Sequence, residues 1–201
     1  MGVWKDVGLT IAAYKAGERG RRLRLLLAGR GVTTAAARGA ERPKSAVFAA
    51  ARPFALSRFV FFEGGGFVSA TDAEVIRGFF GLASDYGKFE AASAVVAVVD
   101  AFVMPGEPMR ETLRLCVRAL SAIERGAADP ELTAAVFKLK FFQAEGLVSA
   151  ERAPEAAALI LETPPERAFG FRAGASASAD VIAFADRSAR AALERRIQTD
   201  K

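Results

Sequence analysis

The hydrophobic pattern of this chain changes near residue 80, and that change limits the folds that the chain can adopt. Before it, short apolar and aromatic runs are separated by glycine-rich turns, which is typical of β-strands. After it, apolar residues recur every three or four positions, which is typical of helices. The sequence therefore predicts an α+β protein, with one domain over residues 1–80 and an all-helical domain over residues 81–201.

Five strands are expected in the first part. The run Phe54–Glu63 is the clearest, because aromatic residues favour strands and Gly64-Gly65-Gly66 supplies a turn directly after it. The other expected strands are Val7–Tyr14, Leu23–Ala28, Val32–Arg38 and Phe67–Thr71. Five short strands within about 70 residues predict a small closed barrel.

Five helices are expected in the second part. Asp129-Pro130-Glu131 is the clearest start, since it combines an N-cap, a first-turn proline and an acid near the positive end of the helix dipole. That helix should continue to Gly146. The others are expected after Asp85 as far as Val103, from Leu113 to Ile123, over Pro154–Leu161 and over Ala179–Ile197, with a loop at residues 166–179.

Positive charge is concentrated in the first part. The net charge is +5, but residues 1–80 carry 13 basic and 6 acidic side chains, against 15 and 17 afterwards. Between residues 15 and 58 there are 11 basic side chains and only Glu18 and Glu41 to oppose them. Such segmental charge indicates a polyanion-binding surface. The alternative is an arginine-rich surface that serves solubility alone.

Two basic segments provide the candidate binding residues. The loop Arg38–Ser45, RGAERPKS, places three cations around a glycine and a proline and can reach successive phosphates, although it could equally be a solvated connection. In Arg19–Arg24, strand alternation puts Arg22 and Arg24 on the face opposite the leucines. The residues expected to bind the polyanion are Arg21, Arg22, Arg24, Arg38, Arg42, Lys44, Arg52 and Arg58.

The sequence does not assign a binding role to the aromatic side chains. Phe59 and Phe61 share one face of their expected strand, and Phe62 shares the other face with Arg58. One of the two faces must be core, which leaves open that one phenylalanine is exposed near Arg58, but core packing is the favoured interpretation of these rings. No base-stacking residue is therefore assigned.

Most familiar catalytic chemistry is missing from the sequence. It has no histidine, which removes Ser-His and Cys-His pairs, and its single Cys116 is interpreted as a core thiol on a helix. The carboxylates are dispersed, and Gly64-Gly65-Gly66 lacks the Lys-Ser/Thr of a phosphate loop. We expect no catalytic residue, cofactor or metal site, with an uncharacterised enzyme as the less favoured alternative.

The chain is expected to be cytoplasmic. Charged residues interrupt any apolar run within residues 1–30, so no secretory signal is predicted. The most apolar run, Ala91–Met104, contains Asp100 and is too short for a bilayer core of about 30 Å.

The order of these segments resembles RecO, a family of bacterial recombination-mediator and DNA repair proteins. Gly17-Glu18 is similar to the family's Tyr-Gly-Glu turn, and Arg38–Ser45 to its Lys-Gly-Ala-Arg-Arg-x-x-Ser-type loop. Pro53-Phe54 opens the strand that leads to the Gly-rich hairpin, and Lys138–Gly146 is similar to the family's Leu-rich helix that closes in Leu-Gly. The resemblance covers roughly residues 5–146.

The resemblance implies an N-terminal OB-fold followed by a helical domain. It also implies binding to single- and double-stranded DNA, annealing of complementary strands, partnership with RecR and the acidic tail of SSB, and help in loading RecA at SSB-coated gaps, in association with the nucleoid. Arg38, Arg42 and Lys44 are the residues that the loop motif carries over to DNA contact. The alternative is a module of the repair machinery that binds proteins and not DNA.

One departure from the family pattern is plain. Many members carry a four-cysteine zinc module just after the Leu-Gly helix, where this chain has Leu147–Ala153 and no cysteine. This chain therefore cannot bind that zinc, although some members lack the module too. The contacts that other members make through the module are not expected to carry over to this chain.

Overall fold

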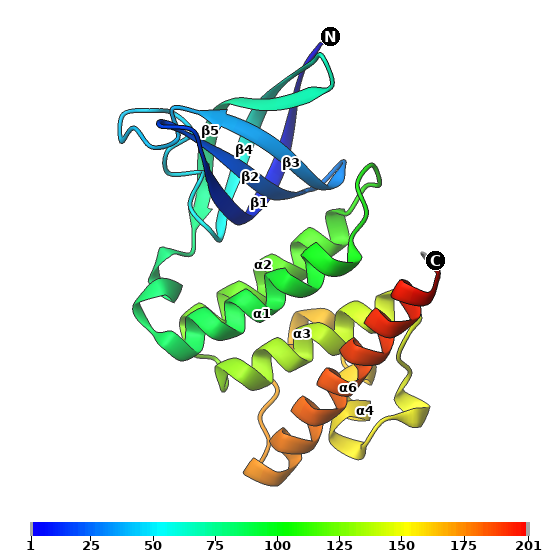
Figure 1. The fold of residues 1–201 in the computed structure, drawn as a ribbon. Helices are drawn as coiled ribbons and strands as arrows, with labels where there is room; N and C mark the ends of the chain where they lie inside the picture. Colours follow the sequence, from blue (N-terminus) through cyan, green and yellow to red (C-terminus); the bar gives the residue numbers. More distant parts are fainter. Residues whose placement is uncertain (1, 200–201) are drawn as a thin grey trace. The chain divides into compact units, whose positions relative to one another are not determined.

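A computed structural model describes residues 2–199, which divide into two compact units (Figure 1). The first unit contains the residues up to Phe80 together with Val103–Leu113. The second contains Gly81–Phe102 and the residues from Arg114 onward. A domain boundary after residue 80 stays a prediction, because the first unit also takes in this later segment.

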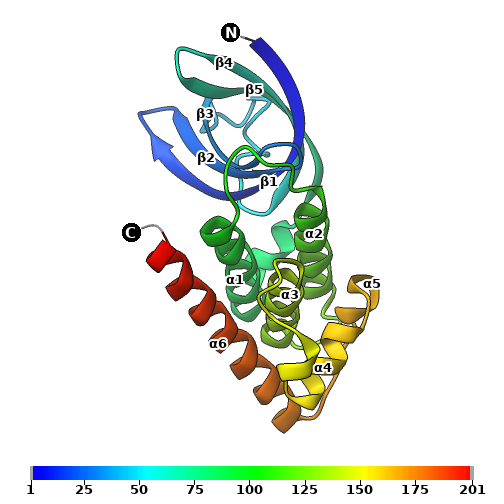
Figure 2. The same ribbon diagram turned by 90° about the vertical axis from the view of Figure 1, so that its right-hand side faces the viewer.

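The first unit is a closed five-stranded barrel (Figure 2). Its strands are β1 (Gly2–Ala16), β2 (Gly20–Leu27), β3 (Gly31–Arg38), β4 (Ala55–Gly64) and β5 (Phe67–Gly78). They pair in the order β1-β2-β3-β5-β4, antiparallel throughout except between β3 and β5. This confirms the predicted α+β class and the five-stranded OB-fold barrel.

β2 begins at Gly20, three residues before the expected Leu23, and β1 and β5 extend much further beyond their expected bounds. β1 begins at Gly2 because its first half pairs with β4 and its second half with β2, and a bulge between Thr10 and Ala12 marks the change. β5 continues to Gly78 along β4 through two register shifts. The polar residues in this extension face outward, so the apolar pattern did not include them. Phe54, expected as the first residue of β4, instead has a positive φ of 66° just before it.

The barrel interior follows the strand alternation expected from the sequence. The residues that fill it include Leu23, Leu25, Leu27, Phe59 and Phe61, all fully buried. Small alanines of β3 face these large side chains, and their size suits the narrow interior of a small barrel. The connection between β3 and β4 is tied to β1, because the Thr10 hydroxyl donates to the Ala50 carbonyl at 2.7 Å.

The second unit is helical. Its elements are η1 (Phe80–Ser84, with Phe80 in the first unit), α1 (Tyr86–Phe102), α2 (Arg110–Arg125, whose first turn lies in the first unit), α3 (Pro130–Ala144), η2 (Ala150–Arg152), α4 (Glu155–Glu162), α5 (Pro165–Ala168) and α6 (Ala175–Thr199). α3 is the central helix and contacts α1, α4 and α6. Asp129 caps α3 as predicted, accepting from the Leu132 amide at 3.0 Å.

The loop expected at residues 166–179 is wrong in part. Pro164-Pro165 begins the short helix α5, because a proline is well suited to the first turn of a helix. α6 starts at Ala175, four residues earlier than predicted, in an alanine- and serine-rich segment that carries no apolar periodicity. Within residues 2–199 no helix is both long and apolar enough to cross a membrane.

Candidate nucleic-acid interface

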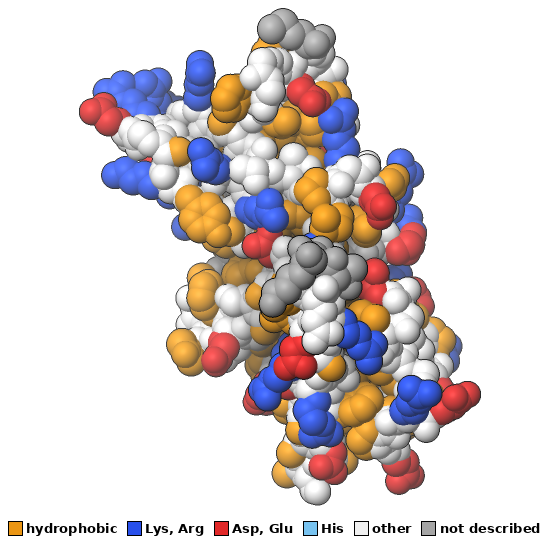
Figure 3. Space-filling model, turned by 45° about the vertical axis from the view of Figure 1, so that its right-hand side comes forward, with side chains coloured by type: hydrophobic (Ala, Val, Ile, Leu, Met, Phe, Trp, Pro, Cys, Tyr) orange, Lys and Arg blue, Asp and Glu red, His pale blue; other side chains and the backbone are white. Residues whose placement is uncertain are grey.

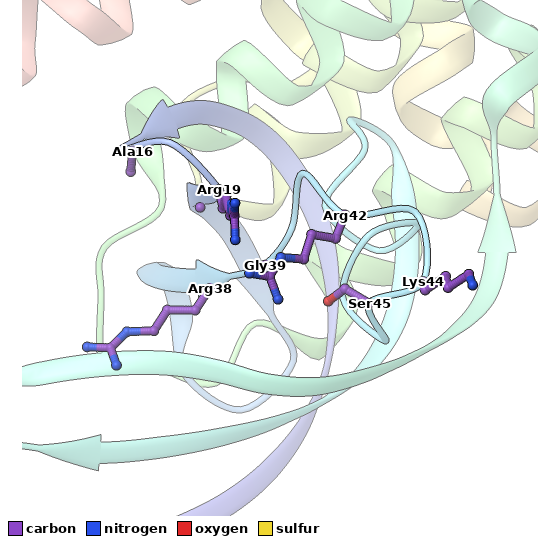
Figure 4. A pocket seen from close by; sticks show the side chains of 8 residues that line it. Ala16, Arg19, Arg38, Gly39, Arg42, Lys44 and Ser45 are labelled. Atoms are coloured by element: carbon purple, nitrogen blue, oxygen red, sulfur yellow. The ribbon is translucent and has the colours of Figure 1, made fainter.

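The turn between β1 and β2 and the loop after β3 border an open cleft of about 640 Å³ on the barrel (Figure 4). Four cationic side chains line it, and the described lining contains no carboxylate. The lining residues are Ala16, Arg19, Gly20, Arg38, Gly39, Arg42, Lys44 and Ser45. A cleft with only positive charge attracts anions, because nothing in its lining offsets the potential.

The loop after β3 is shaped by its own backbone. The Arg42 amide donates to the Gly39 carbonyl at 2.8 Å, and the Ser45 amide donates to the Arg42 carbonyl at 2.9 Å. Gly39 has a φ of 76°, a conformation that other residues adopt only with strain. These turns bury Ala40 and leave the side chains of Arg42 and Lys44 exposed, so the loop presents its cations on a folded frame.

The four cleft cations have no acidic partner within the described part of the chain. Arg19, Arg38, Arg42 and Lys44 are exposed and take part in no ion pair there. Figure 4 shows Arg19 and Arg42 beside Gly39, with Lys44 at the outer end of the loop. Their charge is therefore available to a ligand. Blue side chains also recur over the first unit in the space-filling view (Figure 3).

Arg21, next to the cleft, is engaged by Glu41. The Arg21 Nε lies 2.7 Å from Glu41 Oε1, and its Nη2 lies 3.4 Å from Oε2. The hydrogen bond from Arg21, with a smaller contribution from its charge, holds the pKa of Glu41 below its usual value. Glu41 thus competes with any anion for Arg21.

The structure places the other predicted residues outside the cleft lining. Arg22 and Arg24 lie on the outer face of β2 as expected, and Arg24 donates to the Thr34 hydroxyl at 3.2 Å. Arg52 lies over the Phe80 ring at 5.1 Å, and Arg58 forms an ion pair with Glu74. The loop residues Arg38, Arg42 and Lys44 all line the cleft, with Arg38 and Lys44 directed to opposite sides of it (Figure 4).

Arg19 lines the cleft but was not among the predicted site residues. The pairing of β2 with β3 brings Arg19 to the cleft, because the next residue, Gly20, pairs with Arg38 at the end of β3. Sequence spacing alone does not give that pairing.

A second cleft, of about 420 Å³, lies on the helical unit. Three arginines, Arg152, Arg187 and Arg195, line it together with apolar residues that include Leu147 and Phe184. Part of its wall is the segment after α3, Gly146–Ser149. Among residues 2–199 no three His, Cys, Asp or Glu side chains gather as metal ligands. Cys116 is buried, which raises the pKa of its thiol.

Comparison with known proteins gives matches that agree with one another. Residues 1–79 match the family described as "Recombination protein O N terminal". The chain is 31% identical over 154 residues to "DNA repair protein RecO" of Streptomyces coelicolor, covering 73% of this chain and 62% of that protein. Identity to the protein of the same name is 29% over 140 residues in Rubrobacter xylanophilus (70% and 56% covered). In Acetivibrio thermocellus it is 25% over 146 residues (73% and 58%). These matches span about three fifths of each relative's length.

Proposed function

The chain belongs to the RecO family of DNA repair proteins, and from that premise we propose that its barrel binds the phosphate backbone of DNA in the basic cleft. The observation that carries the proposal is the set of four exposed cations with no acidic partner in the described chain. Phosphates are the anions that arginine and lysine bind most readily on nucleic acids. Arg22 and Arg24 on the adjoining strand extend the surface.

The proposed mechanism is electrostatic. Cations that replace the counterions of DNA gain affinity by releasing them, without reading the bases. Single and double strands should therefore both bind, with little sequence preference. Neutralising the phosphates of one strand lowers its repulsion against a second, which favours annealing of complementary strands.

Further partners follow from the family premise. We propose that the chain acts with RecR and helps to load RecA at SSB-coated gaps, in the cytoplasm and at the nucleoid. The second cleft suits the acidic tail of SSB, because Arg152 and Arg187 can hold carboxylates while Leu147 and Phe184 contact an apolar terminal residue.

The alternative is a module that binds repair proteins and not DNA, and the arginine-lined cleft on the helices is the observation in its favour. Two double variants with the same charge change separate the two functions. Arg42→Gln/Lys44→Gln alters the barrel cleft, and Arg152→Gln/Arg187→Gln alters the helical cleft.

The test measures fluorescence anisotropy of a labelled oligonucleotide and of a labelled acidic peptide with an apolar C-terminus. We expect the barrel variant to lose DNA affinity and keep peptide affinity, and the helical variant to do the reverse. Equal DNA affinity in the wild-type protein and the barrel variant would remove the cleft from the DNA site. Wild-type protein that binds only the peptide would support the alternative.

A further inference from the structure

A hollow of about 660 Å³ adjoins the basic cleft on the barrel, and Arg38 lines both. Two phenylalanines, Phe62 near the end of β4 and Phe67 at the start of β5, form its aromatic wall. The small residues Ala36 and Ser69 also line it. Aromatic rings and an arginine thus share one surface.

Strand pairing explains why these side chains meet. Ser69 pairs with Phe62 on one side and with Ala36 on the other, so the three residues lie in one row across β4, β5 and β3. Residues opposite each other in a sheet face the same side, and so do residues two apart along a strand. Phe67 therefore shares the outer face with Ser69, and Arg38 shares it with Ala36. The small side chains leave an open floor between the rings and the guanidinium.

The two rings are exposed although the same hairpin offers a core. Phe59 and Phe61 of β4 are fully buried, whereas Phe62 is 43% and Phe67 is 76% exposed. Among the described residues no other aromatic ring stacks on either of them. Large exposed apolar side chains that cluster on one face are typical of a binding surface.

The charge beside the rings identifies the occupant. We propose that Phe62 and Phe67 stack on unpaired bases of a single DNA strand while Arg38 and the cleft cations hold its phosphates, an inference that rests on the proposed function. Aromatic rings next to a cationic track are the means by which proteins bind single strands without sequence preference. No carboxylate lines the described hollow or the adjoining cleft, so the whole surface suits a polyanion.

The arrangement predicts that a duplex binds in the basic cleft alone, whereas an unpaired strand uses both the cleft and the hollow. In a duplex the faces of the bases are already stacked on one another, so only the phosphate contacts are available to it. An unpaired strand can use the phosphate contacts and the rings together. The hollow therefore adds affinity for single strands alone and keeps bases of an unpaired strand apart from its own neighbours, ready to pair with a second strand.

The test removes the rings and keeps their apolar character. Phe62→Leu/Phe67→Leu is compared with the wild-type protein on a single-stranded oligonucleotide, on an abasic strand of equal length and on a duplex. Stacking on one ring contributes about fivefold or more to affinity when the ring is replaced by alanine, and leucine retains part of the apolar contact, so the double variant should bind the single strand at least about fivefold more weakly. Its affinities for the abasic strand and the duplex should stay unchanged, and so should its melting temperature.

The control is Tyr86→Leu, which removes an 80% exposed aromatic ring from the helical unit and should leave all three affinities unchanged. If the phenylalanine variant binds the single strand as the wild-type protein does, the stacking inference fails while the proposed function stands. If it loses duplex and single strand equally, the rings do not read unpaired bases and the inference again fails. If the wild-type protein binds none of the three ligands, the proposed function itself fails. A change in sedimentation with unchanged DNA affinity would instead assign the rings to contact with a second copy or another protein.

Discussion

The ion pair between Arg21 and Glu41 leads to the prediction that removing the negative charge of Glu41 strengthens DNA binding. Glu41 lies beside the four-cation cleft and occupies the Arg21 guanidinium through a contact of 2.7 Å and another of 3.4 Å. Glu41→Gln keeps the size of the side chain but removes its negative charge. Arg21 then becomes available to a phosphate at the edge of the cleft.

The magnitude follows from counterion release. One additional phosphate contact makes the slope of log affinity against log salt more negative by about 0.7 for a single strand and about 0.9 for a duplex. At about 0.1 M salt, this corresponds to a gain in affinity of about fivefold for a single strand and about eightfold for a duplex. The gain should shrink as the salt concentration rises.

The assay is anisotropy of a labelled single strand, titrated with both proteins over a salt series. Glu63→Gln serves as the control, because Glu63 pairs with Arg30 rather than with a residue of the cleft. We expect the control to leave the slope unchanged. If Glu41→Gln leaves both affinity and slope at their wild-type values, Arg21 does not contact the DNA and the DNA-binding surface does not extend to Arg21.

Three further predictions concern the stability of the two units. Burial lowers the pKa of Lys140 below its ordinary 10.5, so the unfolded chain binds more protons and the free energy of unfolding should rise with pH toward that value. Lys140→Met should abolish this rise in denaturant titrations; a persistent rise would contradict the assignment. At neutral pH the variant should cost about 1 kcal/mol, because Gln143 Oε1 loses its donor while the Leu161 carbonyl keeps the hydrogen bond from Gln143 at 3.0 Å. Leu25→Ala should destabilise the barrel by about 2–5 kcal/mol in urea, since the side chain is fully buried, and a cost below about 1 kcal/mol would show that the core collapses around the gap. Asp129→Ala should cost about 1 kcal/mol through loss of the cap on α3, with Asp129→Asn as the variant that retains most of it; equal melting temperatures for the two would refute a capping role.

Local patterns in the sequence predicted the parts of the fold that depend on neighbouring residues. Strand alternation places the leucines of β2 on one face of that strand, and Phe59 and Phe61 on one face of β4. The structure buries both sets of side chains in the barrel. The cap at Asp129 was equally readable, because its partner lies three residues away. Residues 166–179 were misread because α5 is only four residues long and the first turn of α6 consists of alanine and serine, so neither segment shows an apolar period.

The candidate site was predictable only in its central loop. Arg38, Arg42 and Lys44 come from one segment and all line the cleft. Arg19 joins them through the pairing of Gly20 with Arg38, which depends on the register of β2 against β3.

Other properties of the surface arise from residues far apart in the sequence. Arg21 is engaged by a carboxylate 20 positions away, which no local pattern shows. The exposed ring of Phe67 is a candidate binding residue because it lines the same hollow as Arg38, and only the closed barrel brings these two residues to one surface.

The most direct test of the central claim, that the barrel cleft binds DNA phosphates, is the salt dependence of wild-type binding to a single strand. If the four cleft cations each meet one phosphate, log affinity should fall against log salt with a slope at least as steep as about −2.8, or about 50-fold between 50 and 200 mM, and contacts from Arg22 and Arg24 would steepen it further. The same measurement on Arg42→Gln/Lys44→Gln should give a slope about 1.4 less negative than that of the wild-type protein. Absent binding at low salt, or a slope near zero, would contradict the account.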